Sequence, residues 1–198
     1  MDDITGAHTS LHAEAGARRG EHPGRARNPV IKVADLAWLE FDKPDLRRAA
    51  DFARAFGFHT TTTDSGELHL RGTDAGAPCV IIRRGPHTRF RGLAFRADPA
   101  DLNRLAAHTG AAVVALPESL GGQAVHLTDP SGTPVSVVAD LHERPALPSQ
   151  PPHLFNFGHT APRTNATQRP ARVPAGIQRL GHVVLASTTY LTTLDFYL

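Results

Sequence analysis

The chain has few of the residues that cross-link a protein. Among its 198 residues there is a single cysteine, Cys79, which excludes an internal disulfide and any zinc site built from several cysteines. The three residues after Cys79 are apolar, a pattern typical of a buried strand. Cys79 is therefore predicted to be a core thiol and not a reactive one.

The chain also lacks long apolar runs and a strong charge of one sign. It has no stretch of about 18 apolar residues, and its N-terminus has no apolar segment of the signal-peptide kind. The formal net charge of +2 is too small to indicate a nucleic-acid-binding protein. We therefore expect a soluble, cytoplasmic protein that contacts neither membranes nor nucleic acids.

The apolar content is 40%, which is enough for a packed core over most of the length. Residues 1–30 combine Gly, Ala, Arg, His and Pro without a periodic apolar face, and this predicts a disordered leader. Residues 141–176 contain seven prolines, which interrupt helices and central strands and predict an interdomain connector. Two ordered parts are therefore expected, residues 31–140 and residues 177–198.

The first ordered part begins with a strand at residues 33–41, followed by a helix that Pro44 opens and Gly57 ends. The apolar residues of this helix recur at helical spacing: Leu46, Ala49 or Ala50, Ala53 and Phe56. Three short strands are predicted next, at residues 58–63, 67–71 and 79–83. This segment is therefore a βαβββ unit.

The same order of elements repeats about 56 residues later, and internal repetition is a strong fold signal. A strand at residues 91–96 precedes a helix that Asp98 can cap, with Pro99 at its first position and Gly110 at its end. Three strands are predicted after it, at residues 113–116, 123–128 and 135–139. Residues 31–140 are thus predicted to hold two βαβββ units.

A third copy opens after the connector, with a strand predicted at residues 180–186 and a helix capped by Ser187 or Thr188. The helix would carry its apolar residues on one face: Leu191, Leu194 and Leu198. No further strands come after it in the sequence. The predicted fold class is α+β, with paired βαβββ modules and an incomplete third module.

Several motifs at these positions resemble one known family. Residues 52–58 have the form Phe-x-x-x-x-Gly-Phe, and residues 196–198 look like the opening of the same motif. The turn at residues 129–132 is similar to an Asp-Pro-x-Gly turn, and residues 179–185 look like a join between two domains. The chain resembles the vicinal-oxygen-chelate superfamily of glyoxalases, bleomycin-resistance proteins and dioxygenases. Within it, a two-domain extradiol (ring-cleaving) dioxygenase truncated at its C-terminus is the best match.

The resemblance implies a metal site in the second domain, made by two histidines and one glutamate. His182 is at the position of the first ligand, and the other two would come from residues that this sequence does not contain. The metal would be Fe(II), with Mn(II) as an alternative, and the substrates would be a catechol or other aromatic diol and O₂. A single imidazole holds Fe(II) poorly, so the chain alone is expected to bind iron weakly and to be inactive.

The first two modules offer no comparable ligands. Trp38 lies 14 residues before Phe52, as His182 lies 14 residues before Phe196, and the matching strand position of the second module is close to Gly92. These side chains, like Ser136 on the last strand, are poor metal ligands. The first domain is therefore predicted to have no metal site. A weaker possibility is a site that combines strand histidines and glutamates of this domain: Glu40, Glu67, His69 and His126.

Three alternatives stay open from the sequence. His182 could be a core histidine that hydrogen-bonds a backbone carbonyl. The chain could be a non-catalytic module that binds a small hydrophobic ligand in the cup of residues 31–140, as resistance proteins do. It could also be a degraded gene product, of which proteolysis within residues 141–176 would leave only the first domain intact. A homo-oligomer is compatible with each of them.

Overall fold

The computed structural model describes residues 22, 24, 26–150, 154–165 and 173–198. Most of the predicted leader, and residues 151–153 and 166–172 of the predicted connector, lie outside the described residues. The strands and helices are β1 (Asp35–Lys43), α2 (Leu46–Phe56), β2 (His59–Thr62), β3 (Leu68–Arg71), β4 (Val80–Arg84), β5 (Arg89–Arg96), α3 (Pro99–Thr109), β6 (Val113–Ala115), β7 (Gln123–Thr128), β8 (Pro134–Ala139) and α4 (Tyr190–Tyr197).

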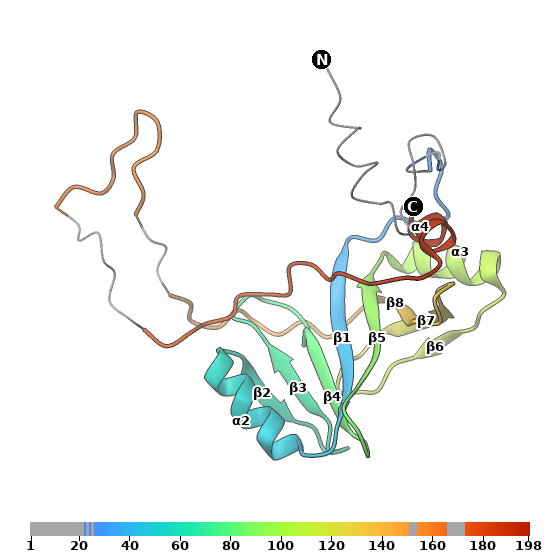
Figure 1. Ribbon diagram of the computed structural model, residues 1–198, viewed down its shortest axis with the longest axis horizontal. Helices are drawn as coiled ribbons and strands as arrows, with labels where there is room; N and C mark the ends of the chain where they lie inside the picture. Colours follow the sequence, from blue (N-terminus) through green and yellow to red (C-terminus); the bar gives the residue numbers. More distant parts are fainter. Residues whose placement is uncertain (1–21, 23, 25, 151–153, 166–172) are drawn as a thin grey trace.

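The eight strands form one sheet in the order β2-β3-β4-β1-β5-β8-β7-β6. In each half the first strand pairs in parallel with the last, β1 with β4 and β5 with β8. The two first strands, β1 and β5, pair antiparallel with each other and so join the halves (Figure 1). The predicted α+β fold of paired βαβββ modules is thus confirmed.

Local sequence signals set the ends of the two larger helices. Asp45 caps α2 by accepting a hydrogen bond at 2.9 Å from the backbone N–H of Arg48, and Gly57 ends this helix in the left-handed conformation. Helix α3 starts at Pro99 and ends at Gly110, as the sequence predicts, but Asp98 in the N-cap position makes no side-chain capping hydrogen bond. Within the described part of the chain, no helix is long and apolar enough to cross a membrane.

The apolar side chains divide between the two faces of the sheet. Under α2 lie Leu68, Leu70 and Ile82, and a similar cluster lies under α3. On the opposite face, residues from both modules form a shared core: Ala37, Trp38, Ile81, Ala94, Leu120, Ala124 and Val138. Cys79 is buried, and this burial raises the pKa of its thiol, as expected of a core residue.

One detail of the predicted apolar stripe on α2 is wrong. Phe56 was expected to face the core, but it is 52% exposed and stacks between the rings of Phe52 and Phe58. The small residues Ala50 and Ala53 are the buried positions of this helix. The helix therefore packs close to the sheet through alanines, and its aromatic residues line its outer side.

The strand predicted at residues 180–186 is not formed. The segment is extended but has no sheet partner among the described residues. A strand requires a neighbour for its backbone N–H and C=O groups, and β1 and β5 already have a neighbour on each side. The first strand of a third module would need partner strands of its own, and none lies beside residues 180–186 among those that the structure describes.

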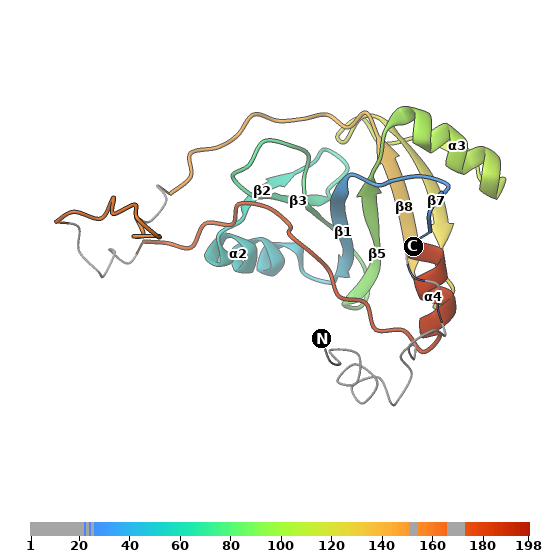
Figure 2. The same ribbon diagram turned by 90° about the horizontal axis from the view of Figure 1, so that it is seen from above.

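Helix α4 also differs from its prediction. Its N-cap is Thr189, instead of Ser187 or Thr188, and its one buried residue is Thr193. The predicted apolar face does not point inward as a whole, since Leu191 is exposed. The helix lies beside the second module (Figure 2). It packs there through Tyr197, whose ring lies 6.0 Å from that of Phe95.

The segment 173–179 is attached to the first module. The backbone N–H groups of Thr73 and Asp74 donate to the carbonyls of Ile177 and Gln178, and the N–H of Ile177 donates to the carbonyl of Gly57. Two glycines allow this approach, because a Cβ would lie 2.6 Å from the Ala175 oxygen at Gly57 and 1.9 Å from the Gln178 oxygen at Gly72. The C-terminal segment therefore crosses the molecule while held to the end of α2 and to the turn after β3 (Figure 1).

Candidate functional site

The face of the sheet opposite the helices is hollowed, and we call this hollow of about 910 Å³ the cup. Both modules contribute to it, through strands β1, β4 and β5 on one side and through β7, β8 and the loop after β6 on the other. The side chains that carry the chemistry of the cup are Trp38, Glu40, Arg83, Arg89, Arg91, His126 and Ser136.

Trp38 lies in the first module at the position that the sequence spacing matches to His182. Leu39 and Leu93 pair with each other across β1 and β5, and each begins the parallel pairing of its strand, with Val80 of β4 and Val135 of β8, so the two leucines are equivalent positions. The preceding residues, Trp38 and Gly92, are then equivalent too, which agrees with the sequence alignment. Trp38 is 1% exposed, and its Nε1–H donates to Oε1 of Glu40 at 2.8 Å. A buried indole therefore stands in the first module at the position matched to His182.

A chain of charged side chains continues from Trp38 across the first module. Arg83 donates through Nη1 to Oε2 of Glu40 and, at 2.6 Å, through Nε to Oε1 of Glu67. The second oxygen of Glu67 lies 3.2 Å from Nε2 of His69, which is buried. Because one guanidinium is held between two carboxylates, its orientation is fixed and its charge is compensated.

The pKa values in this network follow from burial and from Arg83. Burial alone would raise the pKa of Glu67, but the hydrogen bond and charge of Arg83 outweigh it, so the pKa is lowered. For His69 burial dominates over the attraction of Glu67, and its pKa is lowered. The network therefore holds an ionised glutamate beside a neutral imidazole at neutral pH.

The second module contributes a smaller polar pair. Nδ1 of His126 lies 2.8 Å from Oγ of Ser136, its direct partner across the β7–β8 ladder. His126 is exposed, and Ser136 is half-buried. No carboxylate orients this imidazole within the described residues, so the pair is a cross-strand hydrogen bond and not a catalytic triad.

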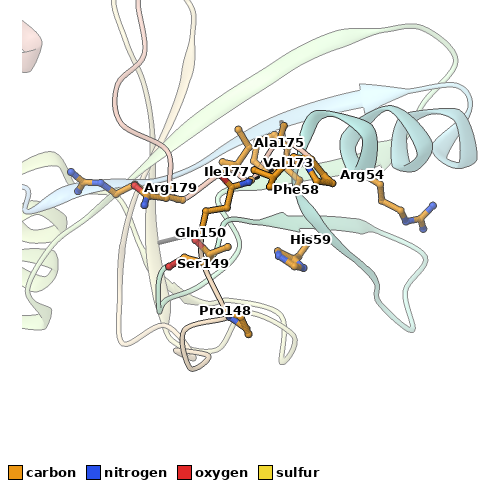
Figure 3. Close-up of a pocket in the computed structure, with 15 residues that line it drawn as sticks. Arg54, Phe58, His59, Pro148, Ser149, Gln150, Val173, Ala175, Ile177 and Arg179 are labelled. Carbon is orange, nitrogen blue, oxygen red and sulfur yellow. Dashed lines mark hydrogen bonds between the residues drawn. The ribbon is translucent and has the colours of Figure 1, made fainter. Parts of the chain in front are cut away.

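A second hollow, of about 820 Å³, lies between the first module and the connector. Figure 3 shows His59, Ser149 and Gln150 around its centre, while the side chains of Arg54 and Arg179 point away from it. Nε2 of Gln150 donates to the carbonyl of Pro174 at 2.6 Å and so joins the two limbs of the connector. This hollow is a consequence of the attached connector and has no buried charged group in its lining.

The structure places His182 in the extended segment after the connector, where its side chain is exposed. Among the residues that the structure describes, no group of three His, Cys, Asp or Glu side chains could hold a metal ion. The role of His182 as a metal ligand therefore stays a prediction. Three arginines of the cup were not predicted as site residues from the sequence: Arg83, Arg89 and Arg91. For Arg83 a signal was present, because it follows an apolar run in its strand.

Comparison with known proteins gives structural matches only. No protein-family model and no curated protein matches the chain. The 2,3-dioxygenase LapB from Pseudomonas sp. KL28 is similar with a TM-score of 0.51 and 21% identity, over 58% of this chain and 43% of that chain. Homoprotocatechuate 2,3-dioxygenase from Arthrobacter globiformis has a TM-score of 0.53 and 21% identity, over 62% and 41% of the two chains.

The Mn(II)-bound glyoxalase from Novosphingobium aromaticivorans is similar to the same extent, with a TM-score of 0.52, 20% identity, and coverage of 61% of this chain and 43% of that one. The chain thus spans less than half the length of these solved structures. At about 20% identity, these likenesses show a shared fold. The chain therefore has the vicinal-oxygen-chelate fold of extradiol dioxygenases and glyoxalases.

Proposed function

We propose that this chain is the leading part of an extradiol-type ring-cleaving dioxygenase that acts on catechols or other aromatic diols with O₂. The proposal is supported by a repeated spacing. His182 precedes Phe196 by 14 residues, as Trp38 precedes Phe52, and this third opening comes after a two-module body similar to 2,3-dioxygenases. In the proposal, His182 is one ligand of Fe(II), or of Mn(II) as an alternative.

The residues present do not fit a complete iron site. Open coordination of Fe(II) by two histidines and a carboxylate leaves places for a chelating diol and for O₂. The described part of this chain supplies the exposed imidazole of His182 and no group of three ligands around it. Ring cleavage would therefore need ligands from residues outside this chain, and the first domain would shape and support the protein.

Iron titration of the chain in the absence of O₂ tests the first part of this proposal. We expect only weak binding, and no yellow ring-cleavage product after catechol and O₂ are added. The second part is tested by joining the chain to the remaining modules of a two-domain 2,3-dioxygenase. His182→Ala should then remove the iron, whereas His159→Ala, at an exposed connector histidine, should not. Retention of iron by the His182→Ala protein would contradict the proposal.

A second candidate function is favoured by the cup itself. Its volume of about 910 Å³ and its mixed apolar and polar lining are those of a small-molecule site. In this alternative the chain is a binding module without catalysis. A saturable change in Trp38 fluorescence with a small aromatic compound, unchanged by His182→Ala, would support it, because His182 is not part of the cup.

A further inference from the structure

Two arginines at the start of β5 share a single carboxylate. Nε of Arg89 lies 3.5 Å and Nη1 of Arg91 lies 3.6 Å from the same Oδ2 atom of Asp42. Both distances are longer than a good hydrogen bond, so neither guanidinium is firmly held. Two positive charges face one negative charge, and one positive charge is left without a partner in this group.

These two arginines differ from the third arginine of the cup. Arg83 is held by Glu40 and Glu67 and has no free charge to offer. The side chains of Arg89 and Arg91 are 63% and 42% exposed, so their remaining N–H groups are accessible from the cup that they line. The cup therefore has an accessible cationic rim and a compensated interior.

The floor of the cup is apolar. Trp38 and Leu120 are each 1% exposed and pack in the same core cluster. The N–H of the indole is already used by Glu40 and its ring is buried, so Trp38 closes the floor of the cup. The apolar surface that a ligand can reach is that of half-buried Leu116 and exposed Pro117, which also line the cup. Apolar groups bury favourably against such a surface, and a planar ring covers it with little loss of conformational freedom.

We propose that the cup binds a planar aromatic carboxylate, with its carboxylate on Arg89 and Arg91 and its ring over Leu116 and Pro117, above the floor that Trp38 and Leu120 close. This inference rests on the second candidate function, because it needs the cup to be a binding site. Guanidinium groups bind carboxylates through two parallel hydrogen bonds, and two of them together select an anion over a neutral molecule. An amide of the same shape keeps the ring contacts and loses the charge.

The test uses Trp38, the only tryptophan of the chain, as a reporter of the cup. Its fluorescence is followed while the full chain is titrated with benzoate, with the neutral benzamide, and with chloride at equal ionic strength. We expect a saturable change with benzoate, binding at least about tenfold weaker with benzamide, and no change with chloride.

A double variant locates the anion. Arg89→Gln with Arg91→Gln should weaken benzoate binding at least about tenfold and leave benzamide binding unchanged. The matched control is Arg47→Gln with Arg48→Gln, which removes two exposed arginines from α2, outside the cup. Circular dichroism confirms that each variant is folded.

Two outcomes would overturn the inference, and they can be told apart. Equal affinity for benzoate and benzamide, or equal benzoate binding by the double variant and its control, rejects anion recognition and leaves the cup as a binding site. Absence of a saturable response to both compounds rejects the cup as a site for such ligands altogether. Neither outcome bears on the iron titration, because His182 lies outside the cup.

Discussion

Gly72 lies so close to Gln178 that a Cβ at position 72 would be 1.9 Å from the Gln178 carbonyl oxygen. The contact joins a turn of the first module to the segment that leads to His182. Backbone hydrogen bonds from Thr73 and Asp74 to the same segment lie directly beside it. The segment 177–179 can therefore attach to the turn after β3 only because residue 72 has no side chain.

We predict that Gly72→Ala detaches this segment, because the added methyl group and the carbonyl oxygen cannot both keep their places. The expected cost is about 1–3 kcal/mol, seen as amide hydrogen exchange of Thr73 and Asp74 that is roughly tenfold to a hundredfold faster. Gly181→Ala is the matched control, since nothing lies within 4 Å of a Cβ there. Equal exchange in the two variants would show that the contact is unimportant.

Arg83→Met should destabilise the fold by about 1–3 kcal/mol, because it leaves the carboxylates of Glu40 and Glu67 together without their cation. Urea denaturation at neutral pH measures this loss. Arg84→Met is the control, since Arg84 is exposed and donates only to the carbonyl of Pro44. The difference should shrink below about pH 4.5, where unfolded Glu67 takes up a proton. A loss of equal size in both variants would contradict the role of Arg83.

His69 should make the fold less stable in mild acid. Burial lowers its pKa from 6.5, so the unfolded chain binds the proton more readily than the folded one. Its contribution is therefore complete above about pH 6.5 and decreases as the pH falls toward the lowered pKa. Denaturation between neutral pH and about pH 5 should show a smaller loss for His69→Gln than for the wild type. His126→Gln, at an exposed histidine, should behave as the wild type.

Tyr197→Phe should loosen α4 by about 1 kcal/mol, because the Tyr197 hydroxyl donates to Oδ2 of Asp129 at 3.1 Å. Burial and the carboxylate of Asp129 also raise the pKa of Tyr197 above 10.0. The wild type should therefore lose stability as the pH rises above about 10, and Tyr197→Phe should lack this step. Hydrogen exchange of α4 measures both effects, with Thr192→Ala as the exposed control. Unchanged exchange in Tyr197→Phe would mean that other contacts hold the helix.

The sequence predicted the two-module body well because its signals are local. Asp98 with Pro99 at the start of α3, and Gly57 and Gly110 at the helix ends, act through their own backbone conformations. The buried position of Cys79 followed from its apolar neighbours. Such signals depend on the chemistry of a few adjacent residues, and the rest of the fold does not override them.

The features that were not predicted depend on contacts between residues that are distant in the sequence. The strand at residues 180–186 had the right composition, but a strand forms only beside a free neighbour, and composition carries no information about neighbours. The partners of Arg83 come from β1 and from the residue before β3, so no spacing rule could join them. The outward position of Phe56 was missed because helical spacing alone does not say how close a helix packs.

The hydrogen bond from the Gln150 side chain to the Pro174 carbonyl holds the two ends of the connector together. Proteolytic cleavage at one peptide bond within the described residues 154–165 would therefore not release the C-terminal fragment. That piece would still be held by Ile177 on the first module and by Tyr197 on the second. A nicked sample should therefore run as two bands under denaturing conditions and as one particle in native buffer.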